Sequence, residues 1–283
     1  MTTDTASNII NDIARQLMAV KPTERAMNLR THFELPCIET LRELMAHIKG
    51  VIFPQFYGSD IFDDTAKAYQ LLLEQTCHGI ASTQRISCEE AHPQAEQLAQ
   101  RFLQRLPEIK RLLLTDVSAV THNDPAAGSH IEAVFCYPVV EAMAHYRSAH
   151  EMLNLGIPLL PRIITEMAHS ATGIDIHPAA QIGEYFAIDH GTGVVIGETT
   201  IIGNHVMLYQ GVTLGARNFH YDLQGNPINE PRHPIVEDNV TIYSNASILG
   251  RVRIGHDSVI GGNTWITHDV PAGSRIVQGR EKE

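Results

Sequence analysis

The chain has 283 residues, which is enough for two domains or one large one. Its hydrophobic content of 43% and charged content of 19% are those of a water-soluble globular protein. The formal net charge of −11 argues against nucleic acid or an anionic membrane as a general partner.

The N-terminal residues do not have the composition of a targeting segment. Residues 1–19 lack the basic stretch followed by an apolar core that marks a signal peptide. No run in the chain reaches the roughly 18 apolar residues that a membrane span needs. The four cysteines show no metal-ligand spacing and are expected to be free thiols in a reducing cytoplasm. They are Cys37, Cys77, Cys88 and Cys136. We therefore expect a cytoplasmic protein with no membrane partner.

Residues 1–172 are expected to form a helical domain. Apolar residues recur at helical spacing in six segments, and prolines punctuate the end of the region. The predicted helices cover residues 7–20, 40–51, 65–80, 91–114, 138–155 and 161–171.

Composition changes at residue 173, and residues 173–283 are expected to form a second domain built on a period of six. Ile or Val occupies every position of two series except Thr200. The series are 176, 182, 188, 194, 200, 206 and 212, then 236, 242, 248, 254, 260 and 266. This period indicates a left-handed parallel β-helix of hexapeptide repeats, so the predicted fold class is α+β. Three hexads make one turn, so inward residues are expected to stack on their equivalents three hexads away. The helical domain is expected to cap one end. Enzymes on this scaffold are mostly acyltransferases.

The repeat is interrupted by a polar segment at residues 214–235 that contains Gly, Asn and Pro. A long structureless insertion in a regular solenoid is usually functional, because loops carry binding and catalytic residues. A tolerated surface loop is the alternative. We favour a functional loop because reactive side chains gather at both of its ends.

An Asp-His pair, Asp189 and His190, lies within the repeat, where small or aliphatic residues are expected. Histidine is the side chain best suited to take a proton near neutral pH. Asp175 precedes His190 by slightly less than one predicted turn, so it could approach from the adjacent coil and fix the imidazole tautomer. A corner histidine bonded to backbone is the alternative.

Two further residues carry charge suited to a zwitterion. Arg232, at the end of the loop, could pair with a substrate carboxylate, although a solvated arginine is the commoner case. Asp124 precedes Pro125, and by spacing alone this is a turn or a helix N-cap.

Together these segments resemble serine acetyltransferases, the enzymes that make O-acetylserine for cysteine synthesis. The resemblance covers residues 123–266, about half of the chain, whereas residues 1–110 fit only loosely. It rests on the order and spacing of residues 124–126, 173–180, 189–193, 195–199, 211–215 and 232–234.

The resemblance implies that acetyl-CoA is a co-substrate, that no cofactor is tightly bound and that no metal is used. It implies that His190 is the general base for the serine hydroxyl and that Asp175 orients it. The coenzyme arm would run between two β-helices, with backbone N–H groups near Gly215 facing the thioester oxyanion. The implied coenzyme contacts are Thr213, Gly215, Ala216, Ser244 and Ala246.

The resemblance also implies how serine is held. Asp124, from the helical domain, and Asp189 would hold the ammonium group. Arg232 would hold the carboxylate, and His233 would contact the substrate from the far side of the site. Active sites would lie between subunits of a homotrimer, or of a dimer of trimers joined by the helical domains. L-Cysteine would compete for the serine site.

Three departures from the family pattern stand out. Ala216 replaces a usual glycine, residues 219–221 put two aromatic rings and a histidine in the loop, and residues 243–246 replace a Gly/Ala-rich stretch. The usual C-terminal tail, which ends in Ile, is missing. This counts against a complex with O-acetylserine sulfhydrylase.

Three other functions remain open at this point. The first is an acetyltransferase acting on a sugar or another hydroxyl acceptor, against which the Asp124 and Arg232 pair argues. The second is a zinc-dependent hydratase that uses histidines of adjacent subunits. Its candidate ligands are His190, His205, His220 and His233. The third is a scaffold that has kept the fold without catalysis.

Overall fold

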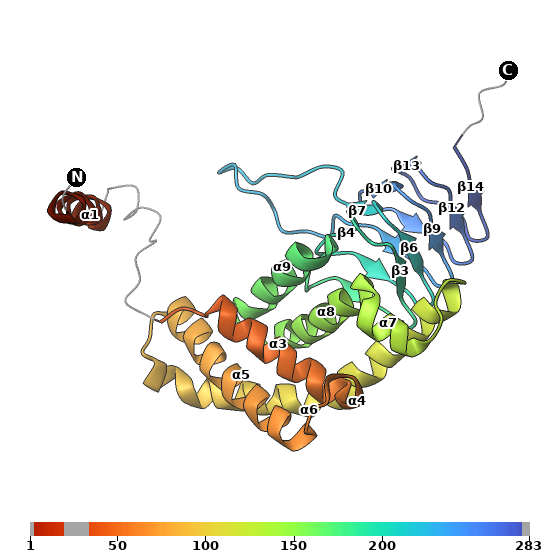
Figure 1. The fold of residues 1–283 in the computed structure, drawn as a ribbon. Coiled ribbons are helices and arrows are strands. Elements are labelled where there is room, and N and C mark those ends of the chain that lie inside the picture. The colour runs from red at the N-terminus through yellow and green to blue at the C-terminus, as the bar shows by residue number, and fades with distance from the viewer. Residues whose placement is uncertain (1–2, 20–33, 279–283) are drawn as a thin grey trace.

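The computed structural model describes residues 3–19 and 34–278, and shows helices followed by a parallel β-helix (Figure 1). This arrangement confirms the predicted fold class. The helices are α1 (Thr3–Met18), α3 (Ile38–Ile52), α4 (Pro54–Tyr57), α5 (Ile61–Gln84), α6 (Cys88–Asn123), α7 (His130–Cys136), α8 (Pro138–Asn154) and α9 (Leu160–Thr172). The predicted helix at 7–20 corresponds to α1, and its last residue lies outside the described ones. The sequence analysis missed α4 and α7, which are too short to establish a periodic apolar pattern.

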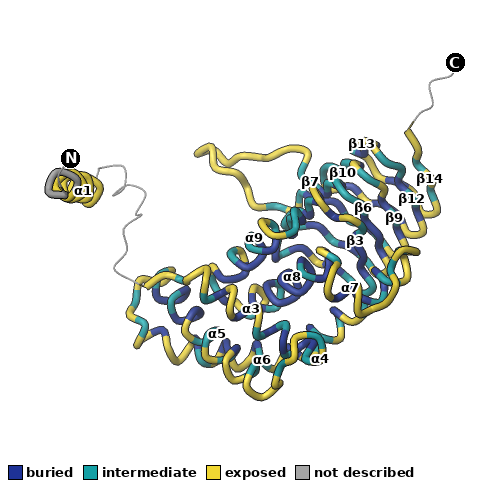
Figure 2. The backbone as a smooth tube through the Cα atoms, in the orientation of Figure 1, coloured by how far each residue is buried: buried dark blue, intermediate teal, exposed yellow. Residues whose placement is uncertain are grey.

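Helix α6 is the longest helix of the described chain, with 36 residues, and it extends well past the predicted end at residue 114. It begins in a capping box, in which Ser87 and Glu90 exchange side-chain and backbone hydrogen bonds. Its apolar face packs against α5 and α8, and Phe102 on α6 and Leu72 on α5 are fully buried. Figure 2 shows buried backbone along α8. The helix ends at Asn123, and Asp124 is its C-cap residue. Of the two interpretations of Asp124, the turn is confirmed, because Asp124 Oδ1 accepts the N–H of Ala126 and residues 125–126 form a turn, and the N-cap is wrong.

The β-helix has three sheets, which the chain visits in turn. Sheet A contains β1 (Asp175–Ile176), β4 (Val195–Ile196), β7 (Thr213–Gly215), β10 (Ser247–Leu249) and β13 (Trp265–Ile266). Sheet B contains β2 (Gln181–Ile182), β5 (Ile201–Ile202), β8 (Ile235–Val236) and β11 (Arg253–Ile254). Sheet C contains β3 (Ala187–Asp189), β6 (Met207–Tyr209), β9 (Thr241–Ile242), β12 (Val259–Ile260) and β14 (Arg275–Ile276). We name the turns from sheet C to sheet A the C/A corner and those from sheet A to sheet B the A/B corner.

Within the two predicted series, which end at position 266, the register of the repeat differs from the predicted one at a single corner. Ile176 pairs with Ile196, whereas Ile196 pairs with Leu214, so the first interval along the chain is longer than the second by two positions. These extra positions lie in the C/A corner after β3. Positions 194, 200, 206 and 212 are buried, as predicted for inward residues, but they lie at corners. The prediction that 194, 200 and 206 stack on 176, 182 and 188 is wrong, because the latter pair with 196, 202 and 208. Most hexads have two buried apolar positions, so a shift of two residues leaves the apolar pattern of the sequence unchanged.

Helices α6 and α8 are fixed to the first coil of the β-helix by a buried ion pair. Arg147 on α8 donates to Asp116 on α6 at 3.0 and 3.1 Å, and to the carbonyl oxygens of Ile182 and Gly183 at 2.6 Å. Asp116 in turn accepts the backbone N–H of Phe186, just before β3. The strand that leads to Asp189 and the helix that ends at Asp124 thus belong to one packed unit.

The loop between β7 and β8, residues 216–234, is not the structureless insertion that we expected. Asp222 accepts the backbone N–H groups of Gln224 and Asn226, and Tyr221 forms an antiparallel bridge with Pro227. The tip is therefore a hydrogen-bonded turn that projects from the β-helix (Figure 1).

Residues 279–283, which bear on the expectation about a complex with O-acetylserine sulfhydrylase, lie outside the described residues. Among those described, no helix is long and apolar enough to cross a membrane.

Candidate functional site

His190 lies in the enlarged C/A corner, and its conformation points its side chain outward. His190, Gly191 and Gly193 all have positive φ, and the N–H of Gly191 bonds back to the carbonyl of Asp189 at 2.7 Å. A non-glycine residue with positive φ costs free energy that the surrounding turn must offset. The result is an imidazole with 71% of its surface exposed, whose Nε2 lies 3.8 Å from Asp189 Oδ2. It is open to a substrate.

Asp124 lies beside this corner and is held by its own hydrogen bonds. Tyr137, at the start of α8, donates its hydroxyl to Asp124 Oδ2 at 2.5 Å, and the N–H of Ala126 donates to Oδ1 at 2.8 Å. These bonds, with a smaller contribution from nearby His190, hold the pKa of Asp124 below its ordinary value. The same bond raises the pKa of Tyr137 to about 12. Asp124 is thus a fixed carboxylate next to a fixed phenol.

The second cluster lies at the A/B corner, where the loop returns to the β-helix. Arg232 Nη2 donates to Glu198 Oε2 at 2.5 Å, and the two side chains are 22% and 27% exposed. The Arg232 guanidinium also lies 6.0 Å from the ring centre of Phe219. Arg232 Nη1 also lies 3.4 Å from Asn229 Oδ1 and 3.3 Å from the carbonyl oxygen of Glu230. A guanidinium has five N–H donors, so Nε and the second Nη2 N–H are available for another anion.

His233 is buried, 7% exposed, and its tautomer is set by Thr199. The N–H of Thr199 donates to His233 Nδ1 at 3.1 Å, so Nδ1 is an acceptor and the proton resides on Nε2. Burial, with a contribution from Arg232, lowers the pKa of His233 to about 4. His233 is therefore a neutral hydrogen-bond donor at pH 7. A Cβ at Gly197 would come within 2.0 Å of its ring, so any larger residue at this position would displace the imidazole.

Asp175 opens β1 on sheet A and does not contact His190 in this state. Among the described residues no hydrogen bond or ion pair joins the two. Instead the carboxylate groups with Glu166 and His169, whose ligand atoms all lie within 4.8 Å of one another. The extra positions of the C/A corner carry His190 away from the nearly stacked register that the sequence suggested for this pair.

One chain does not bring the two clusters together. Asp124, Asp189 and His190 lie at the C/A corner, while Arg232 and His233 lie at the A/B corner, on the opposite edge of sheet A. The edges are separated by a strand and its turns, on the order of 15 Å at about 3.3 Å per residue. Each cluster carries half of the groups expected to hold a zwitterion.

The predicted coenzyme residues are spread across sheet A. Thr213 and Gly215 lie on β7, Ala216 follows it, and Ser244 lies at the C/A corner. Ala246 is fully buried, and its carbonyl accepts the N–H of Thr213 at 3.0 Å. Its side chain therefore packs inside the prism, beneath the surface that the other residues form.

The four histidines considered as zinc ligands lie apart. His190 and His233 occupy the two corners already described. His205 stacks on Tyr185 with ring centres 4.5 Å apart, and His220 pairs with Glu230 in the loop at 2.5 Å. Within one chain, these four histidines therefore do not form a common metal-binding group.

Sequence reasoning missed three residues that order the clusters. Tyr137 holds Asp124, Glu198 holds Arg232, and Thr199 organises the backbone of Arg232 and His233 through its hydroxyl. Glu198 and Thr199 lie in a segment that carried the family resemblance but had no assigned role. Nothing in the local sequence around Tyr137 connects it to Asp124, which follows an earlier helix.

Comparison with known proteins points to one family. The family described as "Bacterial transferase hexapeptide (six repeats)" matches residues 233–268. A plasmid-encoded serine acetyltransferase of Synechococcus elongatus is 45% identical over 265 residues, covering 88% of this chain and 83% of that protein. This span also takes in much of the region before residue 123, where the sequence analysis saw only a loose fit.

Two solved structures give the same result. Entamoeba histolytica serine acetyltransferase 1 in complex with L-cysteine is 36% identical, with a TM-score of 0.72, covering 83% of this chain and 86% of that one. Neisseria gonorrhoeae serine acetyltransferase in complex with serine is 26% identical, with a TM-score of 0.58, covering 90% and 100%.

Proposed function

We propose how this chain, which belongs to the serine acetyltransferase family, transfers an acetyl group to the hydroxyl of L-serine. The reaction gives O-acetyl-L-serine and is the first step of cysteine biosynthesis. Acetyl-CoA is the proposed donor. The observation that supports the residue assignments best is the division of a zwitterion-binding set between two corners of one β-helix.

His190 is the proposed general base. It takes the proton of the serine hydroxyl while that oxygen attacks the thioester carbonyl. The C–S bond then breaks, and the proton passes from His190 to the departing coenzyme thiolate. The exposure of the ring leaves it free to reach a bound serine. Asp175 is proposed to orient the ring once substrates bind, since catalytic hydrogen bonds often tighten only in the complex.

Serine is proposed to bind between charges of opposite sign. Asp124 and Asp189 face its ammonium group, and the low pKa of Asp124 keeps that carboxylate ionised. Arg232 pairs with the serine carboxylate, and its hydrogen bond to Glu198 holds the guanidinium in position for this pairing. His233 adds its Nε2–H as a neutral donor. A sugar offers no such pair of charges, which disfavours the alternative acceptor class.

Because these halves lie on opposite edges of sheet A, we propose that each site forms between two copies of the chain. His190 and Asp124 would come from one copy, and Arg232 and His233 from the next. A cyclic trimer or a dimer of trimers satisfies this requirement, since every copy then offers both edges.

The coenzyme is proposed to lie along the same interface, on the surface formed by Thr213, Gly215, Ala216 and Ser244. Ala246 supports that surface from below. L-Cysteine has the same ammonium and carboxylate groups as serine, and a structure of a relative holds it. We therefore propose that L-cysteine inhibits by occupying the serine site.

Steady-state assays test the base assignment. We expect His190→Ala to keep its assembly and to lose about 10²- to 10⁴-fold in kcat, the usual effect of losing a general base. The matched control His256→Ala, an exposed histidine in another coil, should retain activity. Turnover at the wild-type rate in His190→Ala would refute the assignment.

Mass spectrometry of the products formed from serine and from sugars tests the acceptor class. Acetylation of a sugar without formation of O-acetylserine would contradict the proposal that serine is the acceptor.

A further inference from the structure

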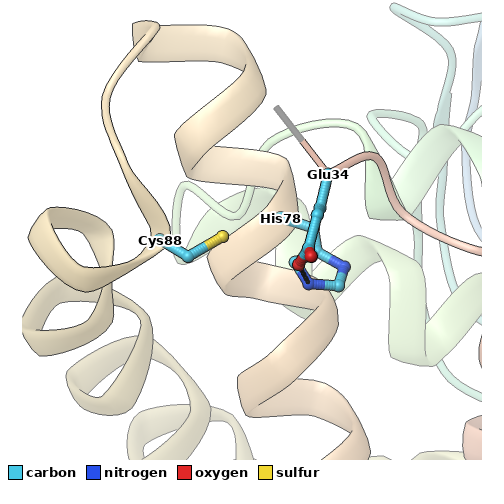
Figure 3. A group of neighbouring side chains, drawn as sticks. All are labelled: Glu34, His78 and Cys88. Carbon is cyan, nitrogen blue, oxygen red and sulfur yellow. Dashed lines mark ion pairs between the residues drawn. The ribbon is translucent and has the colours of Figure 1, made fainter. Parts of the chain in front are cut away.

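Three segments of the helical region bring a carboxylate, an imidazole and a thiol together, away from both corner clusters. Glu34 precedes α3, His78 lies in α5, and Cys88 is the first residue of α6 (Figure 3). One ligand atom from each lies within 4.8 Å of the other two. Zinc is bound in proteins by this combination of oxygen, nitrogen and sulfur donors.

The spacing is close to that of a metal-ligand set. Glu34 Oε2 lies 2.9 Å from His78 Nε2. In a tetrahedral site with bonds of about 2.0–2.3 Å, donor atoms lie roughly 3.3–3.8 Å apart. The exposed Glu34 side chain and the Cys88 rotamer can make the remaining adjustment without moving a helix.

The imidazole is not fully satisfied by the protein. His78 is 15% exposed, and its Nδ1 is buried without a hydrogen-bond partner among the described residues. Buried polar atoms are nearly always paired, and the exceptions call for an explanation. Nε2 is the nitrogen that faces Glu34, so it is the atom that a metal ion in this group would use, and the unpaired Nδ1 lies on the other edge of the ring.

Cys77 lies beside Cys88, and the two thiols differ in their hydrogen bonding and direction. Cys77 Sγ donates to the carbonyl oxygen of Cys88 at 3.0 Å, so its thiol proton is already used in a hydrogen bond. The sulfur of Cys88 instead points toward the Glu34 and His78 side chains (Figure 3). A cavity of about 400 Å³ lies on the Cys88 side of the group and is lined by both thiols, Glu89, His92 and Pro93.

We propose that Glu34, His78 and Cys88 bind a zinc-type divalent cation, with water from the cavity as the fourth ligand. Binding forms a metal–sulfur bond at Cys88 and releases its thiol proton, so affinity should fall as the pH decreases. The ion would join the segment before α3 to α5 and to the start of α6. It would act in the helical region and not in acetyl transfer.

Metal titration of the full-length chain tests this site. The protein is reduced with a phosphine, stripped with a chelator and titrated with Co²⁺ and Zn²⁺. We expect about one zinc per chain after gel filtration, and a near-ultraviolet thiolate-to-cobalt band that zinc abolishes. The band identifies the site, because the Glu166, His169 and Asp175 group contains no sulfur.

Variants complete the test. Cys88→Ser should lose the cobalt band, and Glu34→Gln, a substitution at an exposed side chain, should weaken zinc binding at least tenfold without unfolding. The control Cys136→Ser, an exposed cysteine elsewhere, should bind as the wild type does. Failure of the reduced wild type to bind either metal would overturn the proposal. So would a cobalt band that survives in Cys88→Ser, or a Cys77–Cys88 disulfide in place of bound metal.

Discussion

The Thr199 hydroxyl is the most informative single atom to remove. It accepts the backbone N–H groups of Arg232 at 2.9 Å and His233 at 3.1 Å, and lies 2.9 Å from His233 Nδ1. Thr199→Val keeps the shape of the side chain and leaves both N–H groups without an acceptor. Each unpaired donor costs about 1–3 kcal/mol when buried, and less when partly exposed as here. We therefore expect a loss of about 2–4 kcal/mol in the free energy of unfolding.

The same substitution should weaken serine binding, because it loosens the two residues proposed to face the substrate from the A/B corner. If half of that energy is expressed in binding, KM for serine rises about 5- to 30-fold, at about 1.4 kcal/mol per tenfold. The kcat value should change less, because His190 lies at the other corner. Continuous assay of coenzyme thiol release, together with urea unfolding, measures both effects.

Thr199→Ser supplies the matched control, since it keeps the hydroxyl and loses only a methyl group. It should retain a KM within about threefold of wild type. An unchanged KM for serine in a destabilised Thr199→Val would refute the role of this corner in substrate binding. An unchanged stability would show that the three contacts contribute nothing.

Three further predictions concern the other contacts. Tyr137→Phe removes a charge-assisted hydrogen bond to Asp124 and should lower kcat/KM for serine about tenfold. The acid limb of its pH–rate profile should shift to higher pH, because the pKa of Asp124 rises toward its ordinary value. Arg147→Met leaves a buried carboxylate unpaired and should destabilise the fold by about 3–5 kcal/mol in urea unfolding, with recovery when Asp116→Asn is added. The pKa of His233 is about 4 when folded and near 6.5 when unfolded, so its contribution to stability should be complete above pH 6.5 and decrease toward pH 4. His233→Gln should flatten this decrease.

The period of six predicted the scaffold because burial in a β-helix repeats with each short side of the prism. It did not predict the longer step from Ile188 to Ile196, since both buried positions of a hexad accept Ile or Val. That step is where His190 lies. An insertion that keeps the apolar pattern intact leaves no trace in hydrophobic periodicity, although the glycines around His190 mark it.

The charged residues were identified from the sequence, but their arrangement was not. The Asp124 and Tyr137 pair depends on how α6 and α8 pack, and Thr199 meets Arg232 only because the loop closes on the preceding coil. These are contacts between coils or helices, which local spacing does not encode. Burial of Ala246 likewise follows from its place at a corner.

Complementation between two inactive variants tests the shared site most directly. His190→Ala and Arg232→Ala are co-expressed with different tags, and mixed assemblies are purified and assayed. In a mixed trimer of either composition, one of the three interfaces joins an intact C/A corner to an intact A/B corner, so about a third of wild-type activity should return. Co-expression of His190→Ala with Asp124→Asn, both in the same half, should recover none. Mixed His190→Ala and Arg232→Ala assemblies with no more activity than either parent would contradict a site built from two copies.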